Sequence, residues 1–219
     1  MRKIVDGNLY LLISEEYCRG RSALEVARAA ISGGVDIIQL REKNIFRSDI
    51  AGIARPIMDL CKKNNVVFII NDDPILAKKI DADGVHLGQE DLKLFTADEA
   101  RRLLGRDKII GLSAGSVGEV RKAGLAAIDY IGFGPVFRTT VKEKCIGTKD
   151  VEKVLKIAKR PVFFIGGINL TNIDELLTKG AENIAVIRAI SEADDIRAAA
   201  AELKNKIEEA RCGKIARIR

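Results

Sequence analysis

The stretch Val35-Asp36-Ile37-Ile38-Gln39-Leu40-Arg41-Glu42-Lys43 joins an apolar run to a polar end. The apolar run favours a buried β-strand, in which successive side chains point to opposite faces. Gln39, Arg41 and Lys43 therefore share one face of the expected strand. Two cations and an amide at a strand end fit an anion site, but a solvated strand end explains this single stretch equally well.

The same change from short apolar runs to amphipathic segments repeats along the chain. Serine or threonine with glutamate three residues later, at Ser22–Glu25 and Thr96–Glu99, has the spacing of a capping box at a helix start. The expected strands cover residues 9–13, 35–41, 66–70, 83–87, 108–112, 129–133, 161–165 and 183–187. The expected helices cover residues 22–32, 46–63, 74–80, 96–104, 116–126, 150–158, 171–179 and 192–210.

Eight strand-then-helix units in 219 residues predict an α/β fold, a single (β/α)8 TIM barrel. The strands are apolar almost throughout, which is typical of a parallel sheet buried on both faces. An open doubly wound sheet is the alternative, but no G-x-G-x-x-G motif follows the first expected strand. We expect one domain over residues 1–219, with residues 211–219 as a basic, frayed tail.

The composition narrows the possible functions. Four scattered cysteines and a single histidine disfavour a zinc site or a disulfide framework. The net charge of +6 suits a small anionic substrate, and nucleic acid is disfavoured because no aromatic residues are interleaved with the basic ones. Without a long apolar run or a signal-peptide pattern, we expect a cytoplasmic protein with no membrane partner. Whether it forms a homo-oligomer is left open.

Polar side chains gather where the expected strands end, and a TIM barrel carries its active site at the carboxyl ends of its strands. We therefore expect an anion site at Arg41 and Lys43, with Lys142 arriving from another loop. The other polar residues at these ends are Gln39, Asn71, Asp72, His86, Gln89, Asp91, Ser113, Thr139, Thr140 and Arg188.

Two carboxylates, Asp72 and Asp91, are expected beside these cations. They could form salt bridges, or they could hold one Mg²⁺ ion, which uses one or two carboxylates together with water and substrate phosphates. Asn71 would then be a neutral partner. A second, phosphate-binding loop is predicted at Gly166-Gly167, because loops after strands seven and eight frequently bind phosphate in this fold. His86 is either a packed, hydrogen-bonded histidine or an acid–base catalyst.

Six short motifs occur in a fixed order: QLREK (39–43), INDD (70–73), DGVHLGQEDL (83–92), GLS (111–113), GPVF with a following threonine (134–139) and IGGI (165–168). In motif order and spacing, the chain resembles the thiamine phosphate synthase family from about Leu9 to Ala210. The resemblance implies a barrel enzyme, a Mg²⁺-dependent transferase. It would join a hydroxymethylpyrimidine diphosphate to a thiazole phosphate and release diphosphate, through a pyrimidine cation.

The resemblance also implies roles for individual residues. Arg41, Lys43, Lys142 and Ser113 would be the catalytic groups at the pyrimidine diphosphate. Gln39, Leu40, Glu42 and Asn71 would complete that site, Asp72 and Asp91 would ligate Mg²⁺, and the thiazole phosphate would contact Thr139, Thr140, Val141, Gly167, Ile187 and Arg188.

The sequence departs from the family pattern mainly on the thiazole side. Val141 stands where the family usually has threonine, Arg188 where it has serine, and Gly115 where it often has histidine. The related thiazole tautomerase depends on a histidine at the position of Gly115 and lacks the acid at Asp91, so it is the less favoured enzyme. A barrel that binds a thiamine precursor without turnover is the non-enzyme alternative.

Overall fold

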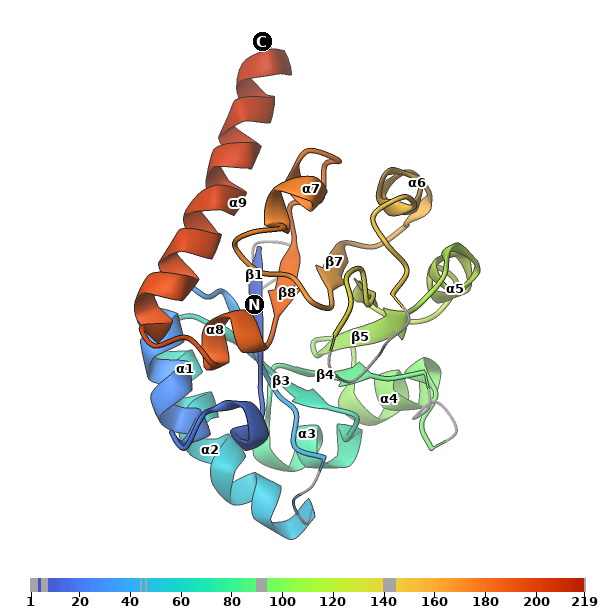
Figure 1. Cartoon of the computed structure of the whole chain (residues 1–219). Helices are drawn as coiled ribbons and strands as arrows, with labels where there is room; N and C mark the ends of the chain where they lie inside the picture. The colour runs from blue at the N-terminus through green and yellow to red at the C-terminus, as the bar shows by residue number, and fades with distance from the viewer. Residues whose placement is uncertain are drawn as a thin grey trace.

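Eight parallel strands form a closed barrel in the structure, a computed structural model that describes residues 4, 8–43, 45, 47–89, 94–139 and 145–218 (Figure 1). The strands pair in chain order, and the last pairs with the first. The TIM-barrel prediction is therefore confirmed. The strands are β1 Leu9–Ile13, β2 Ile37–Leu40, β3 Val67–Asn71, β4 Gly84–Leu87, β5 Ile109–Ala114, β6 Tyr130–Phe133, β7 Val162–Ile165 and β8 Ile184–Val186.

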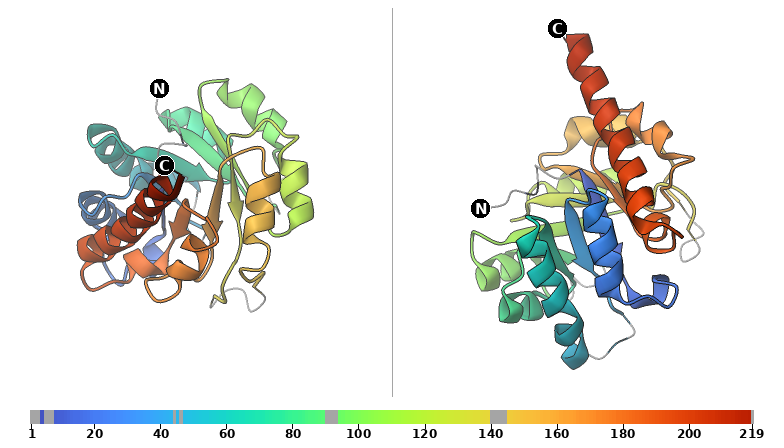
Figure 2. Two further views of the ribbon diagram at one scale, coloured as in Figure 1. Left: turned by 90° about the horizontal axis from the view of Figure 1, so that it is seen from above. Right: turned by 90° about the vertical axis from the view of Figure 1, so that its left-hand side faces the viewer.

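Helices alternate with the strands and surround the barrel (Figure 2). Both predicted capping boxes, Ser22–Glu25 and Thr96–Glu99, are present at helix starts. The helices are the 3₁₀ helix η2 Glu15–Tyr17, then α1 Ala23–Ser32, α2 Arg47–Lys63, α3 Pro74–Ile80, α4 Ala97–Leu104, α5 Val117–Ala123, α6 Val151–Ile157, α7 Ile173–Leu177, α8 Arg188–Ser191 and α9 Ile196–Ile218.

The alternation of side chains along each strand divides the core into two layers. One face of the strands packs against the surrounding helices, with Ile38 and Leu40 of β2 in this outer layer. The other face fills the barrel interior, where Tyr10, Tyr130 and Phe163 are almost fully buried. The interior is therefore packed, and ligand chemistry is left to the strand ends.

The last helix differs from the prediction at both of its ends. Helix α9 begins at Ile196, after the short α8, and runs through Ala210 to Ile218, so the expected frayed tail over residues 211–219 is wrong for its helical part. Alanine, arginine and lysine favour helix, and the segment contains no proline. Figures 1 and 2 show its C-terminal part extending past the barrel. None of the described helices has the length and apolar content needed to cross a membrane.

Aspartates precede alternate strands at the amino end of the barrel, and each accepts hydrogen bonds from the start of the preceding strand. Cations reinforce two of them, at 2.7 Å for Lys204–Asp36 and 2.6 Å for Arg101–Asp129. Such contacts satisfy strand-end N–H groups that would otherwise lack a partner. The main-chain bonds are Asn8 and Leu9 to Asp36 (both 2.9 Å), Phe68 to Asp83 (2.8 Å) and Ile110 to Asp129 (2.7 Å).

Candidate active site

Gln39, near the end of β2, lies inside the barrel with only 1% of its surface exposed. Its Nε2 donates a hydrogen bond to the Tyr10 hydroxyl at 2.6 Å. The next side chain, Leu40, points the other way into the outer core layer, so only its main chain can face a ligand at the barrel mouth. The strand parity expected from the sequence therefore holds for this pair.

The residues after β2 have two different positions: Glu42 bonds a neighbouring loop, and Arg41 and Lys43 lie at the barrel mouth. The Glu42 carboxylate accepts hydrogen bonds from the Glu15 N–H (2.7 Å) and the Ser14 hydroxyl (3.2 Å), which ties this loop to the one after β1. Burial raises the pKa of Glu42 above its usual value, against these hydrogen bonds. Arg41 is half-buried and Lys43 exposed at the same strand end, so both cations lie on the rim of the barrel mouth.

Asp72 follows β3 in left-handed backbone, with φ of 59°. Its Oδ1 accepts from the Gly88 N–H at 2.8 Å, its Oδ2 accepts from the Asn71 side-chain amide, and its own N–H donates to the His86 carbonyl at 2.8 Å. These bonds fix a half-exposed carboxylate between the ends of β3 and β4. Aspartate tolerates this backbone region better than most residues.

The second expected metal ligand, Asp91, lies outside the described residues. Within the described part of the chain, no group of three or more His, Cys, Asp or Glu side chains could hold a metal ion. Asp72 still fits Mg²⁺ by its chemistry, because Mg²⁺ prefers carboxylate oxygens and needs only one or two carboxylates beside water and phosphate.

His86, in β4, lies inside the barrel and hydrogen-bonds through both ring nitrogens. Its Nδ1 lies 3.0 Å from the Tyr130 hydroxyl and its Nε2 2.9 Å from the Ser113 hydroxyl. Burial lowers the pKa of His86 to about 4, so the ring is neutral near pH 7. The packed, hydrogen-bonded interpretation of His86 thus describes its contacts. Ser113 is also held through its carbonyl, which accepts from the Gln89 side chain.

The two glycines after β7 form a turn that admits no side chain. Gly166 and Gly167 have φ of 103° and 67°, and a Cβ on Gly167 would lie 2.4 Å from the Arg138 carbonyl oxygen. This loop therefore packs directly on the segment after β6, where half-buried Thr139 lies. Thr140, Val141 and Lys142 lie outside the described residues.

Arg188 begins the short helix α8, directly after half-buried Ile187. Its Nε forms an ion pair with Glu192 at 2.6 Å, and its guanidinium carbon lies 5.7 Å from the centre of the Tyr17 ring. The side chain is therefore already engaged by the protein on two sides. Gly115, after β5, donates its N–H to Glu119 at 2.6 Å and offers no side chain of its own.

Tyr10 and Tyr130 were not among the residues that the sequence singled out. Both hydroxyls are buried in the barrel, 2.8 Å apart, between Gln39 and His86. A signal existed, because a tyrosine on the lumen face of a strand needs a hydrogen-bond partner when buried. From sequence alone, however, a buried aromatic residue in a strand cannot be told from an ordinary core residue until the strands are placed side by side.

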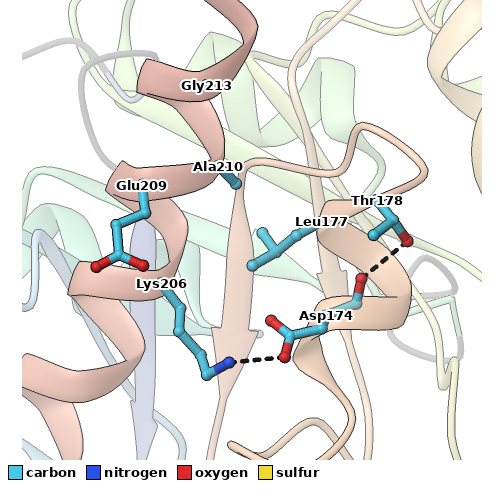
Figure 3. Close-up of a pocket in the computed structure, with 7 residues that line it drawn as sticks. All are labelled: Asp174, Leu177, Thr178, Lys206, Glu209, Ala210 and Gly213. Atoms are coloured by element: carbon cyan, nitrogen blue, oxygen red, sulfur yellow. Dashed lines mark hydrogen bonds and ion pairs between the residues drawn. The ribbon is translucent and has the colours of Figure 1, made fainter.

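A separate groove lies on the outside of the barrel, between α7 and α9 (Figure 3). Leu177 and Ala210 line its apolar part, and an ion pair of 2.6 Å joins Lys206 to Asp174. Because α7 runs back from the strand ends, the groove near its C-terminus lies away from the polar cluster described above. We assign it no role in the chemistry.

The barrel and its cluster of polar side chains at the strand carboxyl ends define the class: a TIM-barrel protein with its site at the barrel mouth. Residues 9–190 match the family described as thiamine monophosphate synthase, and the chain belongs to this family.

Named relatives agree with this assignment. The thiamine-phosphate synthase of Persephonella marina is 41% identical over 206 residues, covering 93% of this chain and 97% of that protein. The thiamine-phosphate synthase of Halalkalibacterium halodurans is 42% identical over 195 residues, covering 88% and 91%. Among solved structures, the thiamine phosphate pyrophosphorylase from Pyrococcus furiosus has a TM-score of 0.84 at 34% identity, covering 93% and 96%. KGPDC from Streptococcus mutans, at 15% identity and a TM-score of 0.61, shares the fold alone.

Proposed function

We propose that the chain is a thiamine-phosphate synthase, a transferase that joins 4-amino-2-methyl-5-hydroxymethylpyrimidine diphosphate to a thiazole phosphate. The products are thiamine monophosphate and diphosphate. The observation that carries the proposal is the position of Gln39, Asp72 and Ser113 at the carboxyl ends of β2, β3 and β5, in a chain 41% identical to a thiamine-phosphate synthase over nearly its whole length.

The proposed mechanism is dissociative. The C–O bond to the diphosphate breaks first, and both electrons leave with the diphosphate oxygen, so a pyrimidine cation forms. The thiazole nitrogen then donates its lone pair to this cation and forms the new C–N bond. This nitrogen carries no proton, so the step requires neither a general base nor a protein nucleophile. The protein's work is positioning and charge stabilisation.

The leaving group is the charged part of this reaction. Arg41 and Lys43 on the rim, with Lys142, are the proposed cations for the developing negative charge on the diphosphate. Asp72 and Asp91 would hold a Mg²⁺ ion, which would supply further positive charge to the diphosphate oxygens. Gln39, deeper in the barrel, would bind the pyrimidine, and half-buried Ser113, near the end of β5, would lie beside the diphosphate.

The thiazole phosphate is assigned to the opposite wall of the mouth. Gly166 and Gly167 form a side-chain-free turn after β7, and the short helix α8 follows β8; loops at these two positions frequently bind phosphate in this fold. Arg188 is held by Glu192 and Tyr17, so main-chain groups around Ile187 and Gly167 would make the main contacts.

The direct test is incubation of the purified chain with both substrates and Mg²⁺. We expect equal amounts of diphosphate and thiamine monophosphate, loss of both with a chelator, and recovery when Mg²⁺ is restored. Binding of both substrates without product would favour the non-catalytic barrel. Isomerisation of a thiazole phosphate alone would favour a tautomerase-like activity. Either result would reject the proposal.

A matched pair of variants separates the two substrate sites. Arg41→Ala should weaken binding of the pyrimidine diphosphate by about tenfold or more, because a hydrogen-bonded charge contact is lost, and should leave thiazole phosphate binding unchanged. Gly167→Ala should do the reverse, since its Cβ would collide with the Arg138 carbonyl. Calorimetry with each substrate reads both effects, and equal losses in both titrations would contradict two separate sites.

A further inference from the structure

A continuous chain of hydrogen bonds crosses the barrel interior. It runs from Gln39 Nε2 to the Tyr10 hydroxyl (2.6 Å), to the Tyr130 hydroxyl (2.8 Å), to His86 Nδ1 (3.0 Å), and from His86 Nε2 to the Ser113 hydroxyl (2.9 Å). Five different strands, β2, β1, β6, β4 and β5, contribute one member each. The chain thereby connects the proposed pyrimidine end of the site to the proposed diphosphate end.

The barrel makes room for this chain by omitting a side chain. A Cβ on Gly111 would lie 2.1 Å from Tyr130 Cζ and 2.5 Å from His86 Nδ1. A Cβ on Gly132 would lie 3.0 Å from His86 Cε1. The tyrosine and histidine rings can therefore meet only because β5 and β6 carry glycine at these lumen positions.

The hydrogen bond that the Gln39 amide donates to the Tyr10 hydroxyl gives the chain one direction. Burial raises the pKa of Tyr10 and of Tyr130, so each hydroxyl keeps its single proton at neutral pH. Because Tyr10 accepts from the Gln39 amide, its own proton goes to Tyr130, whose proton goes to His86 Nδ1. The neutral ring then carries its proton on Nε2 and donates it to Ser113 Oγ. The Ser113 proton is left free to bond an acceptor at the barrel mouth.

The orientation of the Gln39 amide sets this direction. If the amide rotated by half a turn, its oxygen would accept from Tyr10, and each later bond would reverse. The Ser113 hydroxyl would then donate its hydrogen bond to His86 Nε2, and towards a ligand it could act only as an acceptor. Gln39 Oε1 is buried and has no hydrogen-bond partner in the described structure, so a ligand that donates to this oxygen would lock the first orientation.

We infer that Tyr10, Tyr130 and His86 are positioning residues that couple the Gln39 amide to the Ser113 hydroxyl. A donor group of the pyrimidine on Gln39, such as its exocyclic amine, makes Ser113 a hydrogen-bond donor to the diphosphate. The identity of the two ligand groups rests on the proposed function; the direction of the chain does not. The inference is therefore that binding of the pyrimidine ring at Gln39 determines the hydrogen bond that Ser113 makes with the diphosphate of the same substrate.

The first test reads the direction without any substrate. His86 is the single histidine of the chain, so ¹⁵N-histidine labelling gives one imidazole and an unambiguous tautomer. We expect the Nε2–H tautomer in the wild type and a mixture of tautomers in Tyr130→Phe. Phe163→Leu is the matched control, because Phe163 packs edge-on against both tyrosine rings but makes no hydrogen bond in the chain. A wild-type Nδ1–H tautomer, or no change in Tyr130→Phe, would overturn the inference.

The second test asks whether Tyr130 acts through Ser113. With inorganic diphosphate and Mg²⁺ as the probe, Ser113→Ala and Tyr130→Phe should each weaken binding, by about tenfold for Ser113→Ala. The double variant should be no weaker than Ser113→Ala alone, since the proton that Tyr130 positions is already gone. Additive losses, or a wild type that does not bind diphosphate, would overturn the inference that Tyr130 acts on the diphosphate through the Ser113 hydroxyl. An intact tautomer and coupling in a chain that makes no thiamine phosphate would reject the proposed function and support the inference.

Discussion

Aspartates occur at both ends of the barrel, but they are placed differently. At the amino end, Asp36, Asp83 and Asp129 accept hydrogen bonds from strand N–H groups, and lysine or arginine joins two of them. At the carboxyl end, Asp72 has left-handed backbone and holds a half-exposed carboxylate between two strand ends. Left-handed backbone does not by itself separate the two ends, because Asp81, just before β4 at the amino end, has a φ of 62°. The partners separate them: the amino-end aspartates bond the starts of strands, whereas Asp72 bonds groups at the carboxyl ends of β3 and β4, where a TIM barrel carries its site.

Among the variants, Asp72→Asn should have the largest effect on turnover, with little effect on stability. The variant keeps the shape and the acceptor for the Gly88 N–H but loses the negative charge proposed to hold Mg²⁺. We expect turnover to fall at least about 100-fold, a loss comparable to removal of one key electrostatic group. The melting temperature should stay within about 2 °C of the wild type. Near-normal turnover at saturating Mg²⁺ would remove Asp72 from the site.

The buried histidine at the carboxyl end should make the fold sensitive to acid. Burial lowers the pKa of folded His86 to about 4, whereas an unfolded histidine titrates near 6.5. The unfolded chain therefore binds a proton first, and the free energy of unfolding falls as the pH drops below about 6.5 towards 4. This contribution is about 2 kcal/mol between pH 7 and pH 5.

Denaturant unfolding at a series of pH values measures this effect. The His86→Gln variant is the control, because it removes the titrating ring while keeping a polar side chain. The variant should lose less stability than the wild type between pH 7 and pH 5. Parallel pH profiles for the two proteins would show that His86 is not the source of the acid sensitivity.

Asp129→Asn is the amino-end counterpart of Asp72→Asn. It should weaken the bonds from Arg101 and from the Ile110 N–H, and so lower the free energy of unfolding by about 1 to 2 kcal/mol. The folded enzyme should retain its turnover, because the site lies at the other end of the strands. Equilibrium unfolding and kcat/KM, measured on the same preparation, test both statements. A loss of turnover without loss of stability would break the division between the two ends.

The sequence predicted the barrel well because its signals are local. Apolar runs located the eight strands, and capping boxes located the starts of α1 and α4. The helix α8 was missed because four residues after β8 leave no periodic pattern. The end of α9 was misplaced because the residues directly after Ala210 do not continue the buried positions that mark Ile196, Leu203 and Ile207: Arg211 is half-buried and Cys212 is exposed.

For the site, alternation along β2 correctly placed Gln39 in the lumen and so identified one end of the hydrogen-bond chain. The chain itself could not be predicted, because it joins residues up to 120 positions apart. Only the closure of the barrel brings Tyr10 next to Tyr130. Only in the closed barrel is it visible that Gly111 leaves room for the Tyr130 and His86 rings. Motifs therefore identified the residues at strand ends, and packing identified those between them.

The smallest expected effect concerns Glu42. It lies at the carboxyl end of the barrel, but its carboxylate accepts structural hydrogen bonds, as the aspartates at the amino end do. Both of its carboxylate oxygens are already used, by the Glu15 N–H and the Ser14 hydroxyl, so it stabilises the contact between two loops. Glu42→Gln retains an acceptor and should cost less than about 1 kcal/mol of stability. The KM for the pyrimidine diphosphate should change by less than about threefold, which corresponds to a fraction of 1 kcal/mol. A loss of affinity as large as that of Arg41→Ala would instead place Glu42 against the ligand, and the stretch from Gln39 to Lys43 would then serve the substrate along its whole length.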